Sequence, residues 1–213
     1  MPRQLSPTSL RNACISLARD HNEFARVYEL YGVPPMWDRE PGFATLLRII
    51  LEQQVSLASA KACFDKLVSH IGHPTPTAIL DLDDTTLKWI GFSRQKTSYA
   101  RHLSESLLSG RIDLNALDPL DDDEVKSVLT TLKGVGEWTS DIYLLMAMLR
   151  PDVMPRGDIA LHEAYRQLAD LEHRPSSDEF ISLAVKWSPN RSTAARLLWH
   201  YYLSETRTRK SKK

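Results

Sequence analysis

The segment LTTLKGVGEWTS, Leu129–Ser140, joins a polar, acidic stretch to a long apolar one. Its two glycines, Gly134 and Gly136, are separated by one residue and stand directly before a run with helical spacing. Glycine permits positive φ and the close approach of another group to the backbone. Amides at the start of the next helix can then bind a phosphate without a charged side chain. The phosphate belongs either to a dinucleotide cofactor or to a nucleic acid.

A dinucleotide-binding loop is the first alternative. Residues 134–139 resemble the G-x-G-x-x-G fingerprint, and Asp158 follows at about 20 residues, where a ribose-binding acid belongs. However, the third glycine is replaced by Thr139, and the preceding DDDEVKSVLTTL has the acidic first turn and apolar spacing of a helix. Without a strand before it, the fingerprint lacks its structural context. We therefore predict a helix-hairpin-helix that holds a nucleic-acid phosphate, with a plain glycine-rich turn between core helices as the alternative.

Helical periodicity extends over almost the whole chain. Apolar residues recur at three- and four-residue steps, and no alternating segment between turn signals demands a strand. The sequence predicts an all-α protein of about ten helices in two lobes with a cleft between them. The expected helices are 43–51, 55–71, 84–90, 95–108, 122–132, 137–149, 159–170, 177–186 and 191–204, with one or two more in 8–31.

Two segments are candidate seams between the lobes: the proline-rich Gly32–Pro41 and the acidic Asp113–Glu124. We assign 37–117 to a central lobe with the cleft, and 1–36 together with 118–204 to a lobe with the hairpin and Asp158. Residues 205–213 form a basic tail. From Arg191 to Lys213 there are seven basic residues and one acid, which weakly supports a polyanionic partner.

Composition restricts the class of protein. The 213 residues are 42% hydrophobic and 25% charged, as in an ordinary globular protein, and the 27 basic and 27 acidic residues leave no net charge. No apolar run approaches a membrane span, and the start of the chain lacks the apolar core of a signal peptide, so we predict a cytoplasmic location, nucleoid-associated in a bacterium. Two cysteines exclude a four-cysteine iron–sulfur cluster or zinc site.

Asp158 stands where a helix N-cap belongs, and capping is the usual role of such a residue. A carboxylate kept ionised there also suits the stabilisation of a positively charged transition state. With these residues in place, LKGVGEWTSDIYL (132–144) followed by PRGDIAL (155–161) resembles the helix-hairpin-helix, Gly/Pro-rich loop and aspartate of the HhH-GPD base-excision DNA glycosylases. Within that superfamily the chain is similar to the 3-methyladenine DNA glycosylase II branch, whose pattern is also matched by the segments 49–67, 91–103 and 187–199. The resemblance runs from about residue 37 to residue 202.

The resemblance implies excision of alkylated purines from duplex DNA by base flipping, with Asp158 as the catalytic residue. Trp138 occupies the place of the lysine with which other members cut the backbone, so a monofunctional enzyme that leaves an abasic site is expected. The implied base pocket comprises Trp138, Gln53, Gln54, Tyr143, Trp37 and Phe43. The implied DNA contacts are Gly134, Val135, Gly136, Glu137, Thr139, Arg191, and Arg94 and Gln95 at the position of the wedge.

The resemblance also implies a monovalent cation, Na⁺ or K⁺, held by the carbonyl oxygens of Thr130, Leu132 and Val135, and no other cofactor. The expected partner is double-stranded DNA, with no membrane, and the expected state is a monomer. The histidines, His162 included, show no metal-ligand spacing and are interpreted as structural or exposed.

One position departs from the branch. A second aromatic residue often precedes the Arg-Ser of the W-x-P-x-R-S motif, and here that position is Asn190. A one-sided, wider or differently selective pocket follows, unless Tyr143, Trp37 or Phe43 compensates. Two alternatives stay open: a catalytically inert helix-hairpin-helix DNA-binding protein, and a glycosylase of the same superfamily with another damaged-base specificity.

Overall fold

The structure is a computed structural model that describes residues 4–211. In this range the chain forms twelve α-helices and two short 3-10 turns, with no strand, which confirms the all-α prediction. The additional helices have local causes. The segment expected to hold one or two helices forms two of them, and Pro76–Leu80 (α5) is a further short helix that lies between two of the expected ones. Pro76 occupies the first turn of α5, and the Thr75 hydroxyl accepts the N–H of Ala78.

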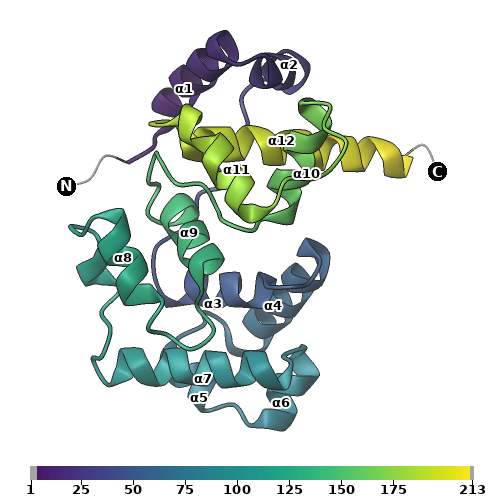
Figure 1. Ribbon diagram of the computed structural model, residues 1–213. Helices are drawn as coiled ribbons and strands as arrows, with labels where there is room; N and C mark the ends of the chain where they lie inside the picture. Colours follow the sequence, from purple (N-terminus) through teal and green to yellow (C-terminus); the bar gives the residue numbers. More distant parts are fainter. Residues whose placement is uncertain (1–3, 212–213) are drawn as a thin grey trace. The chain divides into compact units, whose positions relative to one another are not determined.

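The described chain divides into two compact units, which are treated separately. Unit 1 is Arg39–Met148, and unit 2 consists of residues 4–38 and 149–211 (Figure 1). Unit 1 contains α3 (Phe43–Glu52), α4 (Leu57–Ile71), α5, α6 (Asp84–Ile90), α7 (Arg94–Leu108), η1 (Asn115–Leu117), α8 (Asp122–Leu129) and α9 (Glu137–Met146). Unit 2 contains α1 (Pro7–Asp20), α2 (Asn22–Tyr31), α10 (Ile159–Leu168), α11 (Ser177–Ala184), η2 (Val185–Trp187) and α12 (Arg191–Ser211).

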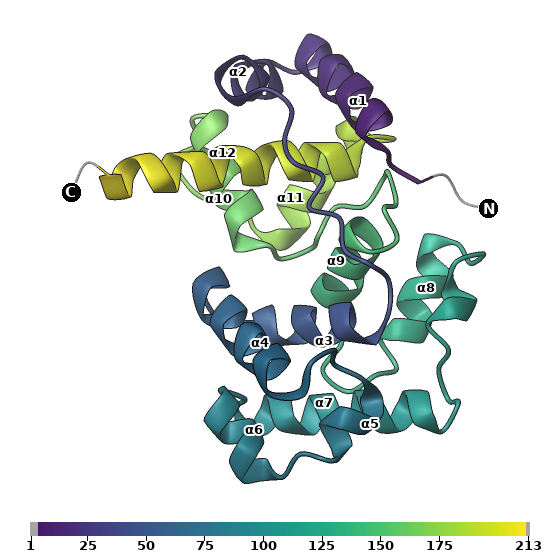
Figure 2. The same ribbon diagram turned by 180° about the vertical axis from the view of Figure 1, so that it is seen from behind.

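Unit 1 is organised around α3, the most apolar of its helices. Leu46, Leu47 and Ile50 are fully buried, as the periodicity predicted, and α3 packs against α4, α7 and α9 (Figure 2). The hairpin between α8 and α9 belongs to this unit, whereas the sequence placed residues 118–148 in the other lobe. The reason is packing: α9 rests on α3, and polar bonds from α3 and α7 reach the hairpin.

Unit 2 packs α1, α2 and α10 around α12. Its core holds an aromatic cluster in which Trp187 meets Phe24, Tyr165 and Phe180 at ring-centroid distances of 5.1, 5.5 and 5.9 Å, all edge to face. Arg196 of α12 is also buried, and its Nε donates to the carbonyl of Met36 at 2.8 Å. Burial lowers the pKa of this guanidinium to about 10, so it stays charged at neutral pH.

The predicted basic tail is helical as far as it is described. Helix α12 continues to Ser211, well beyond the expected end at 204. The side chains of 207–211 and the whole of Lys212 and Lys213 lie outside the described residues, so the tail's role as a polyanion contact stays a prediction. Among the described helices, none is both long and apolar enough to cross a membrane.

Candidate active site

The hairpin is held in a glycine-specific conformation at one of its two glycines. Gly134 has φ +86°, and a Cβ built there would lie 2.3 Å from carbon atoms of the Tyr99 ring. Gly136 has φ −105°, so only Gly134 of the two glycines uses the positive φ that glycine permits. The chain reaches the start of α9 in extended conformation, and an added Cβ at Gly136 would meet nothing within 4 Å. Gly134 therefore serves the fold, and Gly136 leaves open space before α9.

Side chains from elsewhere in unit 1 brace this hairpin. The amide Nε2 of Gln53, at the end of α3, donates to the carbonyl of Gly134 and to Oγ1 of Thr139, both at 2.8 Å. The backbone N–H of Lys133 donates to Nδ1 of His102 at 3.2 Å. The turn is thus tied to both α3 and α7, which pre-organises the hairpin before any ligand binds.

The first turn of α9 differs from most helix starts in the described chain. Its N-cap is Gly136, which provides no side-chain cap, whereas hydroxyl or carboxylate oxygens cap α1, α4, α5, α6, α7, α8, α10 and α11. Glu137 and Trp138 follow, the first exposed and the second half-buried. No side chain caps the first amides of α9, although the acidic Glu137 lies in the first turn. An uncapped helix start of this kind can present its amides to an anion.

Two aromatic residues assigned to the pocket by sequence lie inside unit 1. Tyr143 is 1% exposed, and its hydroxyl oxygen accepts the N–H of Gly42 at 2.9 Å. Burial raises the pKa of Tyr143 to about 12, so the phenol stays neutral. Phe43, the first residue of α3, is also buried. These positions favour packing roles, and a contact with a base stays a prediction for both.

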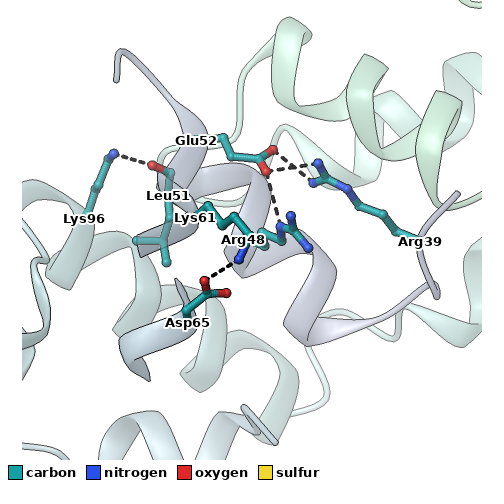
Figure 3. Close-up of polar contacts among 7 residues, drawn as sticks. All are labelled: Arg39, Arg48, Leu51, Glu52, Lys61, Asp65 and Lys96. Atoms are coloured by element: carbon teal, nitrogen blue, oxygen red, sulfur yellow. Dashed lines mark hydrogen bonds and ion pairs between the residues drawn. The ribbon is translucent and has the colours of Figure 1, made fainter. Parts of the chain in front are cut away.

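Charged residues surround the end of α3 (Figure 3). The Glu52 carboxylate accepts two hydrogen bonds from Arg39, at 2.9 and 3.0 Å, and one from Arg48 at 3.3 Å. Nζ of Lys96 donates to the carbonyl of Leu51 at 2.6 Å, a favourable place for a cation at a helix C-terminus. Burial lowers the pKa of Lys96. These contacts fix the end of α3, where the loop that contains Gln54 begins. Gln54 itself is exposed and has φ +55°.

In unit 2, Asp158 is the N-cap of α10 and is half-buried. Its Oδ1 accepts the backbone N–H of Leu161 at 3.1 Å and the indole N–H of Trp199 at 3.3 Å. Gly157, with φ +77°, turns the chain into this cap. The carboxylate is therefore fixed by two donors, one from its own helix and one from α12.

The loop before Asp158 is anchored by the start of α12. The buried hydroxyl of Ser192 donates to the carbonyl of Arg150 at 2.6 Å and accepts the N–H of Val153 at 2.9 Å. Arg191 pairs with Asp152 through Nε–Oδ1 and Nη2–Oδ2, both at 2.9 Å. Burial raises the pKa of Asp152, but the bonds from Arg191 and Ser188 outweigh it, so the net pKa is lowered. Arg191 thus has a structural partner, and its predicted DNA contact stays a prediction.

These motifs coincide with a known family. A model of the HhH-GPD superfamily of base excision DNA repair proteins matches residues 47–190, a segment that includes Gln53, the hairpin and Asp158 and ends directly before α12. The chain belongs to the HhH-GPD superfamily.

Known HhH-GPD proteins resemble the chain over most of its length. It is 32% identical over 200 residues to DNA-3-methyladenine glycosylase 1 of Schizosaccharomyces pombe, covering 90% of this chain and 87% of that protein. The structure of the S. pombe 3-methyladenine DNA glycosylase in complex with abasic DNA superposes with TM-score 0.84 at 29% identity, covering 88% and 95% of the two chains. A Bacillus halodurans DNA-3-methyladenine glycosidase gives TM-score 0.75 at 26% identity, covering 96% and 94%. The comparisons confirm the predicted 3-methyladenine glycosylase branch.

The other HhH-GPD positions assigned from sequence are distributed over both units. Arg94 and Gln95 open α7 and are exposed, and Gln95 donates to the Tyr99 hydroxyl at 2.5 Å. Trp37 lies in unit 2, half-buried beside α12. Thr130, Leu132 and Val135 lie in the hairpin of unit 1, where Val135 is buried. The exposure of Arg94 and Gln95 does not distinguish a wedge from a surface loop, so the wedge role stays a prediction for both.

The contact between Trp199 and Asp158 was not predicted from the sequence. Ser192, Arg196 and Trp199 follow one another at four- and three-residue steps, which places them on one face of α12. From that spacing, the sequence could have identified these three residues as the buried face of the helix. It does not reveal that the indole N–H meets Asp158, 41 positions away in the sequence.

Proposed function

We propose that this HhH-GPD protein is a monofunctional DNA glycosylase that excises alkylated purines of the 3-methyladenine type from duplex DNA and leaves an abasic site for base excision repair. The observation that carries the proposal is Asp158. Its carboxylate is held by two N–H donors. It lies within the matched segment 47–190, at the position to which the sequence resemblance assigns the family's catalytic aspartate. The similarity to proteins named as 3-methyladenine glycosylases over nearly the whole chain supports the substrate class.

The chemistry follows from the charge of the substrate. An alkylated purine such as 3-methyladenine is cationic, so its glycosidic bond is weak and breaks with positive charge developing on the sugar. A fixed carboxylate stabilises this charge and orients the attacking water. No general acid is required, because the base leaves as a neutral molecule. A neutral damaged base such as hypoxanthine lacks this advantage, and its excision is expected to be slower.

The hairpin between α8 and α9 and the side chain of Trp138 are assigned to DNA recognition. In the proposed complex, the amides of 135–138 at the start of α9 hold one backbone phosphate, a contact that carries no sequence information. The open space at Gly136 supports this assignment. The half-buried Trp138 offers an aromatic face to a flipped, electron-poor base. This face attracts a cationic base more strongly than a neutral one.

Excision assays on defined lesions test the proposal. Duplexes that carry 3-methyladenine, 7-methylguanine, hypoxanthine or ethenoadenine are incubated with excess protein, and abasic sites are revealed by alkaline cleavage. We expect the cationic bases to be released faster than the neutral ones. Binding to all four duplexes without release of any base would instead identify an inert DNA-binding protein. Preferential release of a neutral lesion would identify a glycosylase of other specificity.

Trp138 also predicts the absence of lyase activity. A covalent Schiff base requires an amine nucleophile, and the indole of Trp138 cannot provide one. We therefore expect no protein–DNA adduct when borohydride is added during excision, and strand breaks only after alkali. Substitution Trp138→Lys provides the matched comparison, since it places an amine at the same position. A borohydride-trapped adduct with the unsubstituted protein would contradict the prediction.

A monovalent cation at the hairpin is proposed as well, with the carbonyl oxygens of Thr130, Leu132 and Val135 as its ligands. The carbonyl of Leu132 accepts the N–H of Val135 at 3.0 Å, and its second lone pair fits it to a cation. The cation would add positive charge next to the bound phosphate. We expect duplex affinity to fall when K⁺ and Na⁺ are replaced by tetramethylammonium at constant ionic strength. Equal affinity in both media would rule the cation out.

Double-stranded DNA as the ligand and a monomeric state complete the proposal. One phosphate contact and one catalytic carboxylate require no second subunit, and the place of action is the compartment that holds the DNA. Light scattering of the protein with a lesion-containing duplex should give a mass of one chain per duplex.

A further inference from the structure

The indole of Trp199 makes a directional hydrogen bond to Asp158. Its Nε1–H donates to Oδ1 of Asp158, the same oxygen that accepts the N–H of Leu161. Two donors on one oxygen restrict rotation of the carboxylate and therefore set the direction of its other oxygen. Trp199 is only 9% exposed, so the bond lies largely out of water, where a charge-assisted hydrogen bond is strengthened.

A second tryptophan braces the first. The ring of Trp37 meets that of Trp199 edge to face, with 6.3 Å between centroids and 80° between planes. Trp37 has φ +49°, a left-handed conformation that costs a non-glycine residue free energy. The neighbouring carbonyl of Met36 is held by the buried guanidinium of Arg196 at 2.8 Å. Surrounding contacts thus maintain Trp37 in a strained conformation against Trp199.

We infer that Trp199 is a positioning residue for Asp158, and that Trp37 holds Trp199 in place. The indole N–H keeps the carboxylate in the one orientation that stabilises positive charge on the sugar, and the edge of Trp37 keeps the indole from turning away. All three residues belong to unit 2. The inference rests on the proposed function, because the positive charge arises in that reaction.

Two variants remove the N–H donor. Trp199→Phe keeps an aromatic ring, and site-specific replacement of Trp199 by benzothienylalanine keeps the bicyclic shape while sulfur takes the place of N–H. Trp37→Ala removes the brace. Trp89→Phe is the matched control, since Trp89 is an exposed tryptophan of unit 1. Thermal melting of each variant establishes that it is folded, and the isosteric replacement remains informative if Trp199→Phe is not.

The readout separates positioning from general damage. Affinity is measured for two duplexes, one with a cationic pyrrolidine in place of the sugar and one with a neutral tetrahydrofuran. We expect the unsubstituted protein to prefer the cation. Without the indole N–H, this preference and the single-turnover excision rate of 7-methylguanine should each fall roughly ten- to a hundred-fold, as loss of a hydrogen bond to a charge implies. The affinity of these variants for the duplex with the neutral tetrahydrofuran should not change. Trp37→Ala should show a smaller effect of the same sign.

The possible results show separately whether the positioning role or the proposed function fails. Full cation preference and full excision rate in both Trp199 variants would overturn the positioning role while leaving the glycosylase proposal intact. Equal losses for the cationic and neutral probes would also overturn it, since they would indicate general disruption. If the unsubstituted protein releases no methylated base but its cation preference depends on Trp199, the positioning role stands and the proposed function fails.

Discussion

Asp158→Asn should retain the fold and the affinity for DNA while the excision rate falls by about three orders of magnitude or more. Asparagine has the same shape, and its carbonyl oxygen can still accept the N–H groups of Leu161 and Trp199 that now meet Oδ1. Only the negative charge is lost. Because that charge is what stabilises the cationic sugar, the loss should appear in the single-turnover rate with a 7-methylguanine duplex and not in the dissociation constant.

Asp83→Asn is a matched control for this experiment. Asp83 caps α6 as Asp158 caps α10, with Oδ1 accepting the N–H of Thr86 at 2.6 Å, but it lies in unit 1. The two substitutions change a helix cap in the same way, and only one should affect excision. Near-normal release of 7-methylguanine by Asp158→Asn would remove the central claim of the proposed mechanism. A comparable loss in Asp83→Asn would assign the effect to capping.

Gly134→Ala should produce the largest loss of stability among substitutions in the hairpin. Alanine at φ +86° is strained, and its Cβ would overlap the Tyr99 ring at 2.3 Å. Left-handed strain and overpacking together should lower the free energy of unfolding by about 2–5 kcal/mol. For a chain of this size, the melting temperature should fall by about 5–15 °C, which calorimetry can measure.

Gly136→Ala provides the comparison within the same turn. Its φ of −105° suits any residue, and an added Cβ would meet no atom within 4 Å, so stability should change little. The methyl group would occupy the space proposed for a phosphate, and affinity for duplex DNA should fall. Equal melting temperatures for Gly134→Ala and the unsubstituted protein would contradict the argument from the Tyr99 contact. Unchanged affinity in Gly136→Ala would contradict the phosphate assignment.

Local features of the sequence predicted local features of the structure. The apolar spacing of 84–90 gave the bounds of α6, and Asp158 caps α10 as expected from an aspartate before an apolar run. The predicted ends of α8 and α9 were three residues too late, because the apolar residues 132 and 149 continue the spacing after the helices stop. Helix stops depend on the turn that follows as much as on periodicity.

The division into units was harder to predict. The acidic segment 113–124 suggested a seam by its composition, yet the boundary follows Met148, in an apolar stretch. Composition reports solvent exposure, whereas a unit is defined by which helices share a core. Since α9 packs on α3, the hairpin joins the unit of Gln53.

By itself, the sequence determined the all-α class and the family and predicted Asp158 as the key carboxylate, because helix periodicity, caps and short motifs depend on neighbouring residues. Only the tertiary structure decided which distant groups hold these elements. Gln53 reaches Gly134 across 81 positions, and Trp199 reaches Asp158 across 41. Such contacts depend on how whole helices pack, and no spacing within a motif encodes them. The orientation of the carboxylate on which the proposed chemistry depends is therefore a property of the folded chain.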